Sequence, residues 1–317
     1  NWGYGPKPEK IEDLPQWKTV NYITTNYPEA NVMLLIGGEL EHVQFLTYPK
    51  TEHRFELVRR AYIEQHGQWV EKLKSNLLDP ARIVTAQQSL GCAYPIAYLL
   101  KNYDMAMTKT WGRQNVEINI ANNRGACRAY KRRMMIADDP WVGGVWCTRS
   151  PEEMEQVWYL AYFSGIDYLY HEYLGYVELE NKVYPNRWGR NELDFGRFAA
   201  VHPKRGSQIV KVAVMRGFGD DWSLIQCDYS TGPWGHISNF RKGEEIDDYT
   251  LLNAFFPGYG DCSHTDINRF CTGTPFGPVD MVPWDTPVEH LNTYDVVFYF
   301  GLNAMEVDTA VRHGARA

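Results

Sequence analysis

Short apolar runs alternate with longer amphipathic stretches over the first 220 residues of the chain. Runs such as "NVMLLIGGEL", "ARIVTAQQS" and "YDMAMTKTWG" have the length of single strands, and a near-continuous apolar run is typical of a strand buried on both faces. Between the runs, apolar residues recur at helical spacing, as in the long helix predicted over Thr51–Leu78. This regular alternation predicts parallel strands joined by right-handed helical crossovers.

Six strands are predicted before residue 220. The residues at their ends are Glu39, Gln88, Trp111, Trp146, Glu172 and the segment 217–222. Six strands are too few to close an eight-stranded barrel, but the chain begins with Asn1 rather than Met, so one or two strands could precede it. An open doubly wound sheet is the alternative, but the phosphate-binding patterns GxGxxG and GxxxxGK[ST] are absent from the sequence. We therefore predict an α/β fold, a (β/α)8 TIM-type barrel that could be incomplete at its N-terminus.

The clearest local signal marks one helix and the strand after it. In "SPEE", Ser150 supplies a hydroxyl at the N-cap, Pro151 occupies the first helical position and Glu153 the capping-box position, so a helix should start here. Gly165 should end it. The apolar run that follows predicts a strand with Glu172 at its carboxyl end, which is where α/β barrels and sheets carry their chemistry.

The sequence pattern changes after about Tyr249. The Pro/Gly-rich stretch "FFPGYGDCSHTDINRFCTGTPFGPVDMVPWDTP" is too long for a simple connector and is expected to wrap a rim or line a cleft. The next segment, "HLNTYDVVFYFGLNAM", predicts the first strand and helix of a new α/β unit. The predicted layout is a barrel domain over residues 1–285 and the start of a second α/β domain over residues 286–317.

Charge and hydropathy exclude two classes of partner. Lys and Arg number 32 against 39 Asp and Glu, and no block of like charge forms a basic arm, so nucleic-acid binding is not expected. The longest apolar runs, such as Val32–Ile36, are too short to cross a bilayer, so no membrane partner is expected either. If Asn1 is a terminus left by signal cleavage, the protein is exported, extracellular or periplasmic; truncation explains the same start.

No metal or cofactor is predicted. The patterns HExxH, CxxC and GxSxG and the EF-hand loop are absent from the sequence. The six cysteines offer one plausible local disulfide, between Cys262 and Cys271, which have eight residues between them. Buried free thiols are the alternative.

Aromatic residues are abundant, with 11 Trp and 21 Tyr, and many lie in segments rich in Gly, Asn, Asp and Arg. Examples are "NWGYGP", "NRWGRNE", "GFGDDW" and "GPWGHISNF". Large aromatics usually fill cores, but loops on a rigid scaffold are where binding residues collect. Flat rings flanked by amides, carboxylates and guanidinium groups suit the faces and hydroxyl edges of sugars, so the predicted ligand is a carbohydrate.

Two glutamates are the candidate catalytic pair. Glycoside hydrolysis needs one carboxylic acid that donates a proton and one carboxylate that attacks the anomeric carbon or activates water. Glu39 and Glu172 each follow an apolar strand, and both would project from the carboxyl end of the barrel. The structural alternative is that each is a first-turn residue of the next helix, favoured there by the helix dipole.

Eight further residues are predicted to bind substrate. They are Trp111, Arg113, Asn115, Glu117, Trp146, Tyr168, His171 and Trp222. Glu117 could instead stabilise the start of a helix, His171 could be an ordinary hydrogen-bonding histidine, and the tryptophans could be partly core.

The order of these pieces resembles the clan A glycoside hydrolases, and within them beta-galactosidase-like enzymes similar to family 42. The resemblance lies in "IGGEL", "NNRGACRAYKRR" and "GIDYLYHE", and above all in "LLNAFFPGYGD" with "CTGTPFGPVDMVPWDTPVEHLNTYDVVFYFG". It implies a barrel followed by a flavodoxin-like domain that forms homo-oligomers. It also implies a retaining mechanism, which gives Glu39 the role of acid/base and Glu172 that of nucleophile. The family's usual Asn-Glu pair is replaced here by Gly38-Glu39.

Two other functions fit the same residues. A polysaccharide lyase would use Tyr168 or His171 as the base and Arg113 or Arg216 to neutralise a uronate carboxylate. A non-catalytic carbohydrate-binding protein would use the aromatic residues alone.

Overall fold

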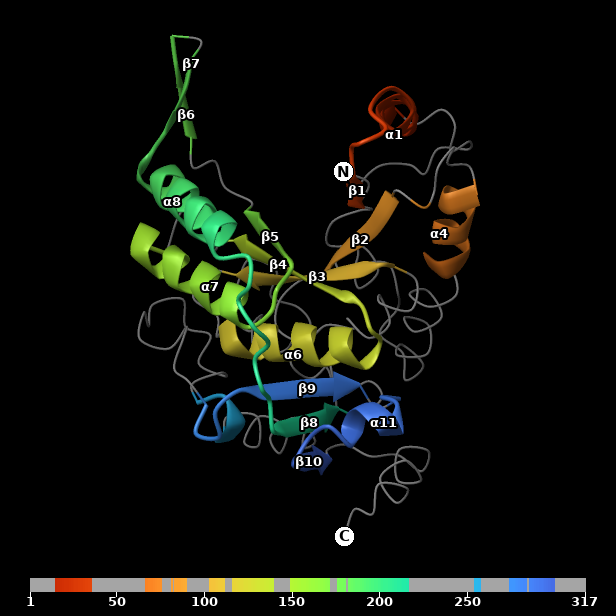
Figure 1. Ribbon diagram of the computed structural model, residues 1–317, viewed down its shortest axis with the longest axis vertical. Coiled ribbons are helices and arrows are strands. Elements are labelled where there is room, and N and C mark those ends of the chain that lie inside the picture. Colours follow the sequence, from red (N-terminus) through yellow and green to blue (C-terminus); the bar gives the residue numbers. More distant parts are fainter. Residues whose placement is uncertain are drawn as a thin grey trace, which may run out of the picture. The chain divides into compact units, whose positions relative to one another are not determined.

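The computed structural model describes residues 15–35, 66–75, 81, 83–89, 103–111, 116–139, 149–171, 176–180, 182–216, 254–257, 274–283 and 285–299. The chain divides into two compact units (Figure 1). Unit 1 comprises residues 1–89 and 95–107, and unit 2 comprises residues 90–94 and 108–317.

Unit 1 contains two helices and parallel strands. Its described elements are α1 (Pro15–Asn26), β1 (Val32–Leu35), α4 (His66–Ser75), β2 (Ile83–Ser89) and the first residues of β3 (Met105–Trp111). β1 pairs in parallel with β2. The three strands confirm predictions from the apolar pattern, and α4 confirms the described part of the helix predicted over Thr51–Leu78. α1 was not predicted.

Unit 2 holds the remaining elements. They are the rest of β3, α6 (Val116–Ala129), β4 (Arg133–Asp139), α7 (Pro151–Phe163), β5 (Tyr168–His171), β6 (Tyr176–Leu179), β7 (Lys182–Pro185), α8 (Arg187–Val201), β8 (Val212–Arg216), β9 (Val279–Pro283), α11 (Val288–Leu291) and β10 (Val296–Tyr299). The strands predicted before Trp111, Glu172 and residue 217 and the helix predicted at "SPEE" are confirmed. β4 confirms the described part of the strand predicted to end at Trp146, since residues 140–148 lie outside the described residues. The β6–β7 hairpin and β9 were not predicted.

Hydrogen bonding places the strands in the order β1-β2-β3 and then β3-β4-β5, with β3 shared by the two units. β4 and β5 are parallel, with Asp138 opposite His171. Consecutive strands that are neighbours, with helices between them, are consistent with part of a (β/α) barrel.

β8 does not continue this sheet, which corrects one expectation. It is the central strand of a separate three-stranded sheet with the order β10-β8-β9, and it pairs in parallel with both neighbours. Because both of its edges carry ladder hydrogen bonds, β8 has no edge left for a barrel strand. The predicted sixth barrel strand therefore belongs to another sheet, which also includes β10 from beyond residue 285.

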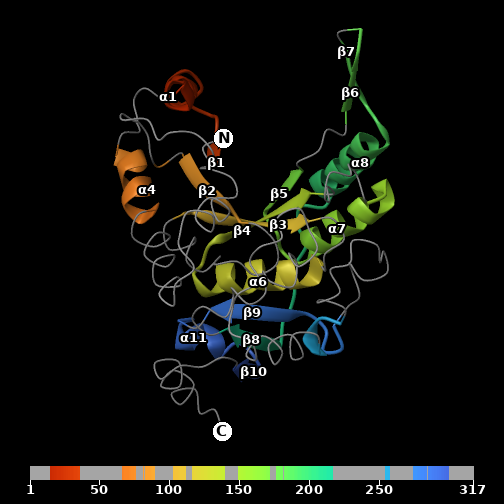
Figure 2. The same ribbon diagram turned by 180° about the vertical axis from the view of Figure 1, so that it is seen from behind.

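The sheet of β8, β9 and β10 packs against α6. The helix lies between β4 and β9 in both views (Figures 1 and 2). One face, with Val116 and Ile120, packs against β4 and α7; another, with Ile118 and Ala121, packs against β8 and β9. A helix that is buried all round needs apolar neighbours on more than one side, and the second sheet supplies them.

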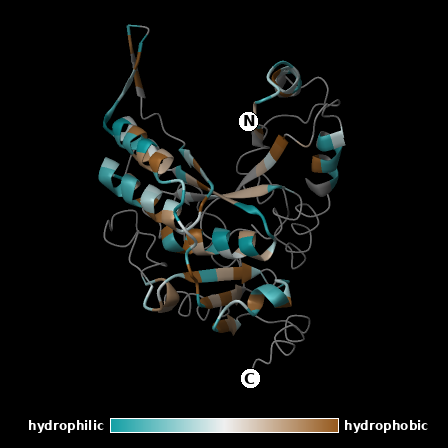
Figure 3. Ribbon diagram, viewed as in Figure 1, coloured by the Kyte–Doolittle hydropathy of each residue, from teal (hydrophilic) through white to brown (hydrophobic). Residues whose placement is uncertain are grey.

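α7 begins and ends as its sequence predicts. The Ser150 hydroxyl accepts a hydrogen bond from the Glu153 backbone N–H, and the Glu153 carboxylate accepts one from the Ser150 backbone N–H. Gly165 has a φ of 97°, a left-handed conformation that glycine adopts without strain. α7 packs beside α8, and both helices carry mixed polar and apolar residues while β8 and β9 are mostly apolar (Figure 3).

Among the described residues, no helix is both long and apolar enough to span a membrane.

Candidate functional site

The structure describes only part of the predicted site. Six predicted residues lie outside the described residues: Glu39, Arg113, Asn115, Trp146, Glu172 and Trp222. Cys262 and Cys271 also lie outside them. Trp111 is the last residue of β3. Glu117, Tyr168 and His171 are placed with their side chains.

The carboxyl end of the β4–β5 pair is the best described part of the site. In the parallel ladder, Ala137 lies opposite Tyr170 and Asp138 opposite His171. His171 is the last residue of β5, and Glu172 follows it in the sequence. Because paired parallel strands end at the same edge, the ends of β4 and β5 lie together where chemistry is expected.

Asp138 forms a buried ion pair at this edge. Its carboxylate contacts the Arg149 guanidinium through Oδ1, and both side chains are fully buried. Thr110 joins them from β3: its hydroxyl lies 3.0 Å from the Ala137 carbonyl oxygen and 3.2 Å from Asp138 Oδ1. The cluster therefore connects β3, β4 and the residue before the N-cap of α7.

His171 lies beside this cluster and packs against α7. Its ring meets that of buried Trp158 edge-on, with centroids 5.7 Å apart and planes at 87°. Two atoms here, His171 Nδ1 and Asp138 Oδ2, are buried and make no hydrogen bond within the described part of the chain. Unsatisfied buried polar atoms are rare in native proteins and call for an explanation.

Sequence reasoning identified His171 but missed Asp138 and Arg149. A signal for Asp138 existed, because "MMIAD" is an apolar run that ends in a carboxylate, as the run before Glu172 does. Arg149 carried no such signal, since its burial depends on a partner eleven residues away.

Tyr168 lies away from this edge. It is the first residue of β5, and its hydroxyl accepts a hydrogen bond of 2.8 Å from Arg133 Nη1 at the start of β4. The structure therefore places Tyr168 at the amino end of the strands and His171 at the carboxyl end.

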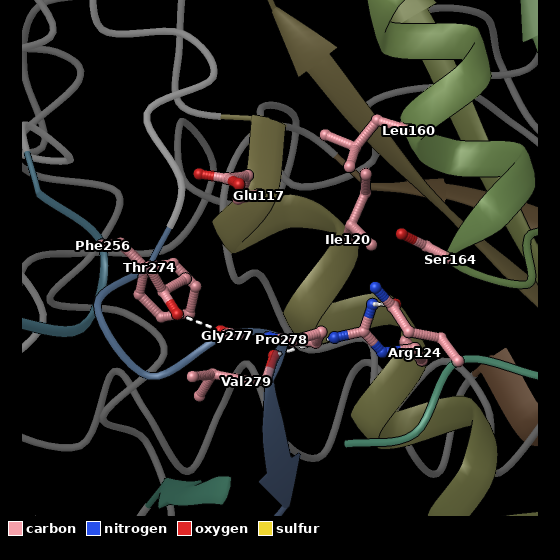
Figure 4. Close-up of a pocket in the computed structure, with 11 residues that line it drawn as sticks. Glu117, Ile120, Arg124, Leu160, Ser164, Phe256, Thr274, Gly277, Pro278 and Val279 are labelled. Atoms are coloured by element: carbon pink, nitrogen blue, oxygen red, sulfur yellow. Dashed lines mark hydrogen bonds between the residues drawn. The ribbon is translucent and has the colours of Figure 1, made fainter. Parts of the chain in front are cut away.

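Glu117 lines a separate pocket in unit 2. It stands in the first turn of α6, where the helix dipole favours a carboxylate. The pocket has a volume of about 250 Å³ and is bounded by α6, the end of α7 and the segment before β9, with Ser164 and Phe256 among its lining residues (Figure 4). Arg124, two turns further along α6, lines it as well.

Arg124 is held by a second buried charged cluster. Its Nε lies 2.5 Å from Asp280 Oδ1, while Arg128 and the Tyr294 hydroxyl contact Asp280 Oδ2 at 3.3 and 2.9 Å. Burial, reinforced by the Asp280 carboxylate, raises the pKa of Tyr294, so the phenol stays protonated and donates. The cluster ties α6 to β9 and to the segment between α11 and β10, which is a structural role.

Unit 1 has a polar cluster of its own around Asp104. The carboxylate accepts hydrogen bonds from the Thr85 backbone N–H at 2.9 Å and from the Thr85 hydroxyl at 2.8 Å, and Lys74 Nζ lies 3.1 Å away. Burial alone would raise the pKa of Asp104, but these contacts together lower it below its ordinary value. Asp104 therefore stays ionised and links α4 to β2.

No group of three or more His, Cys, Asp or Glu side chains among the described residues could hold a metal ion. Cys127 is a free, buried thiol, and burial is the main cause that raises its pKa, so it is not a reactive nucleophile.

Comparison with solved structures identifies a protein of similar fold. No protein-family model matches this chain, and no curated protein matches it. Among solved structures, a beta-galactosidase from the Antarctic haloarchaeon Halorubrum lacusprofundi aligns with a TM-score of 0.52 and 15% identity over 83% of this chain and 42% of that one. This chain has a fold similar to part of a beta-galactosidase.

Two other beta-galactosidases align over similar lengths. The enzyme of psychrophilic Marinomonas ef1 gives a TM-score of 0.48 at 11% identity, over 80% of this chain and 41% of that one. The cold-adapted enzyme of Rahnella sp. R3 gives 0.43 at 16% identity, over 76% and 36%. The chain therefore spans less than half the length of the structures it resembles.

Proposed function

We propose that the protein is a glycoside hydrolase that cleaves a β-galactoside or a related oligo- or polysaccharide with two carboxylates. The observation that carries the proposal is the fold shared with the Halorubrum lacusprofundi beta-galactosidase. It is supported by β5, whose last residue, His171, lies at the carboxyl edge of paired parallel strands and directly precedes Glu172 in the sequence.

In this proposal Glu172 is the nucleophile and Glu39 the general acid/base. Glu172 attacks the anomeric carbon while Glu39 donates a proton to the departing oxygen, and Glu39 then takes a proton from the water that releases the sugar. Both are glutamates at the ends of apolar runs. Homo-oligomer formation through the second α/β domain remains part of the proposal.

The test is hydrolysis of aryl β-galactosides by the full chain and by single variants. Glu39→Gln should lower kcat/KM about 10²- to 10⁴-fold, the usual contribution of general acid–base catalysis, and Glu172→Gln should lower it at least as much. Glu71→Gln is the matched control, because Glu71 is an exposed residue of α4. Its activity should equal that of the wild type.

Other outcomes would support the other functions. An unsaturated product that absorbs in the near ultraviolet would indicate a lyase, since hydrolysis cannot form one. Sugar binding without turnover in the wild type would indicate a binding protein. Full activity in both glutamine variants would reject the assigned pair.

A further inference from the structure

We propose that Asp138, Arg149 and His171 are positioning residues that fix the carboxyl end of β5, and with it Glu172, for catalysis. This inference rests on the proposed function, because Glu172 is its nucleophile. The three residues it adds hold the end of the strand in place and do not contact the sugar.

The first step is the ladder between β4 and β5. Asp138 is the partner of His171 in the parallel register, so the last described residue of β5 takes its position from the end of β4. Glu172 follows His171 directly in the sequence. A displacement of the β4 end is therefore passed to the residue that is bonded to Glu172.

The second step is how the β4 end is itself held. Arg149 pairs with Asp138, and both side chains are 0% exposed. Thr110 adds a contact from β3, and the backbone oxygen of Arg149 accepts a hydrogen bond of 3.4 Å from Trp188 Nε1 of α8. The ion pair thus joins β3 and β4 to the residue before the N-cap of α7, and the backbone of that residue adds a contact to α8.

The third step is the packing of His171 on α7. Trp158, which holds the His171 ring edge-on, lies two turns along the helix that begins beside Arg149. The end of β5 is therefore fixed from two sides, by the ladder to β4 and by α7. The Asp138–Arg149 pair joins these two supports, because Asp138 belongs to β4 and Arg149 precedes the N-cap of α7.

The charged nature of the pair points to positioning over simple packing. Apolar residues of similar volume often stabilise a buried site as well as an ion pair does, so packing alone does not require the Asp138–Arg149 pair. We assign the pair instead a use in fixing geometry at the strand edge that precedes Glu172 in the sequence.

The experiment compares single and double replacements of the pair. Asp138→Asn and Arg149→Met should each lower the melting temperature, and the double variant Asp138→Leu with Arg149→Met should recover much of it, because no unpaired charge remains buried. In all three, kcat per active site should stay about 10- to 100-fold below the wild type, as expected for a misplaced catalytic group. KM should change by less than about threefold.

Active sites are counted with a slow-reacting fluorinated galactoside, so that loss of folded protein is not mistaken for loss of rate. The matched control is Arg124→Met, which breaks another buried pair in the same unit, with Asp280. It should lower the melting temperature and leave kcat per active site unchanged. Hydrogen exchange of the peptide covering 168–175 should speed up in the Asp138–Arg149 double variant and not in Arg124→Met.

The inference is overturned if the double variant recovers stability together with full kcat and wild-type exchange. Wild-type turnover that Glu172→Gln leaves intact, or no turnover at all, would instead reject the proposed function. In that case the exchange measurement still decides whether the pair fixes the end of β5.

Discussion

Gly125 sets how closely α6 approaches β9. A Cβ atom built at this position would lie 2.1 Å from the Met281 carbonyl oxygen and 2.6 Å from its carbon, distances that real side chains do not reach. The carbonyl belongs to the middle of β9 and cannot give way without moving the strand. Position 125 therefore requires glycine, the residue without a side chain.

Gly125→Ala should lower the free energy of unfolding by about 1–3 kcal/mol or more, because overpacking forces backbone shifts. Gly196→Ala is the matched control: Gly196 also lies in a helix, α8, and its added Cβ would meet nothing within 4 Å. It should be neutral or raise stability by up to about 1 kcal/mol. Urea unfolding of both variants measures the difference, and equal stabilities would refute the close contact.

Residue-level prediction succeeded where the signal was local. The turn at Gly165 follows from a glycine at the end of a predicted helix. Arg149 was missed because its role comes from a pairing that no local pattern shows, whereas Asp138 did carry a local signal, its place at the end of an apolar run.

At the scale of elements, α7 shows how far local sequence determines structure. "SPEE" predicted its start and the glycine after it predicted its end, and both are confirmed. By contrast, the β6–β7 hairpin lacks the Asn-Gly or Asp-Gly pair that usually marks a tight turn. Its turn instead uses Glu180 with a φ of 51°, so no local pattern predicts the hairpin.

The capping box of α7 can be tested by itself. Ser150→Ala should destabilise the protein by about 1 kcal/mol, because the hydroxyl no longer accepts from the Glu153 backbone N–H. Ser150→Asp should keep most of the stability, since aspartate is an equally good N-cap. Thermal unfolding measures both, and an unchanged Ser150→Ala variant would show that packing alone sets the start of α7.

At the scale of the whole molecule, the sequence predicted the type of fold better than the arrangement of its sheets. Alternating strands and helices identified an α/β fold that is consistent with part of a barrel and similar to part of a beta-galactosidase. The separate sheet of β8, β9 and β10 was not predicted, because more than sixty residues separate β8 from the other two strands. β9 is only five residues long in a Pro/Gly-rich stretch, so periodicity could not reveal it.

The central claim is that Glu172, next to the last described residue of β5, is the nucleophile of a retaining glycoside hydrolase. The most direct measurement is mass spectrometry of the protein after incubation with a 2-deoxy-2-fluoro-β-galactosyl fluoride, which accumulates the covalent intermediate. The account predicts one added fluorogalactosyl group per chain, located on the peptide that contains Glu172 and absent in Glu172→Gln. An adduct on a different carboxylate, or hydrolysis of β-galactosides with no covalent intermediate, would contradict it.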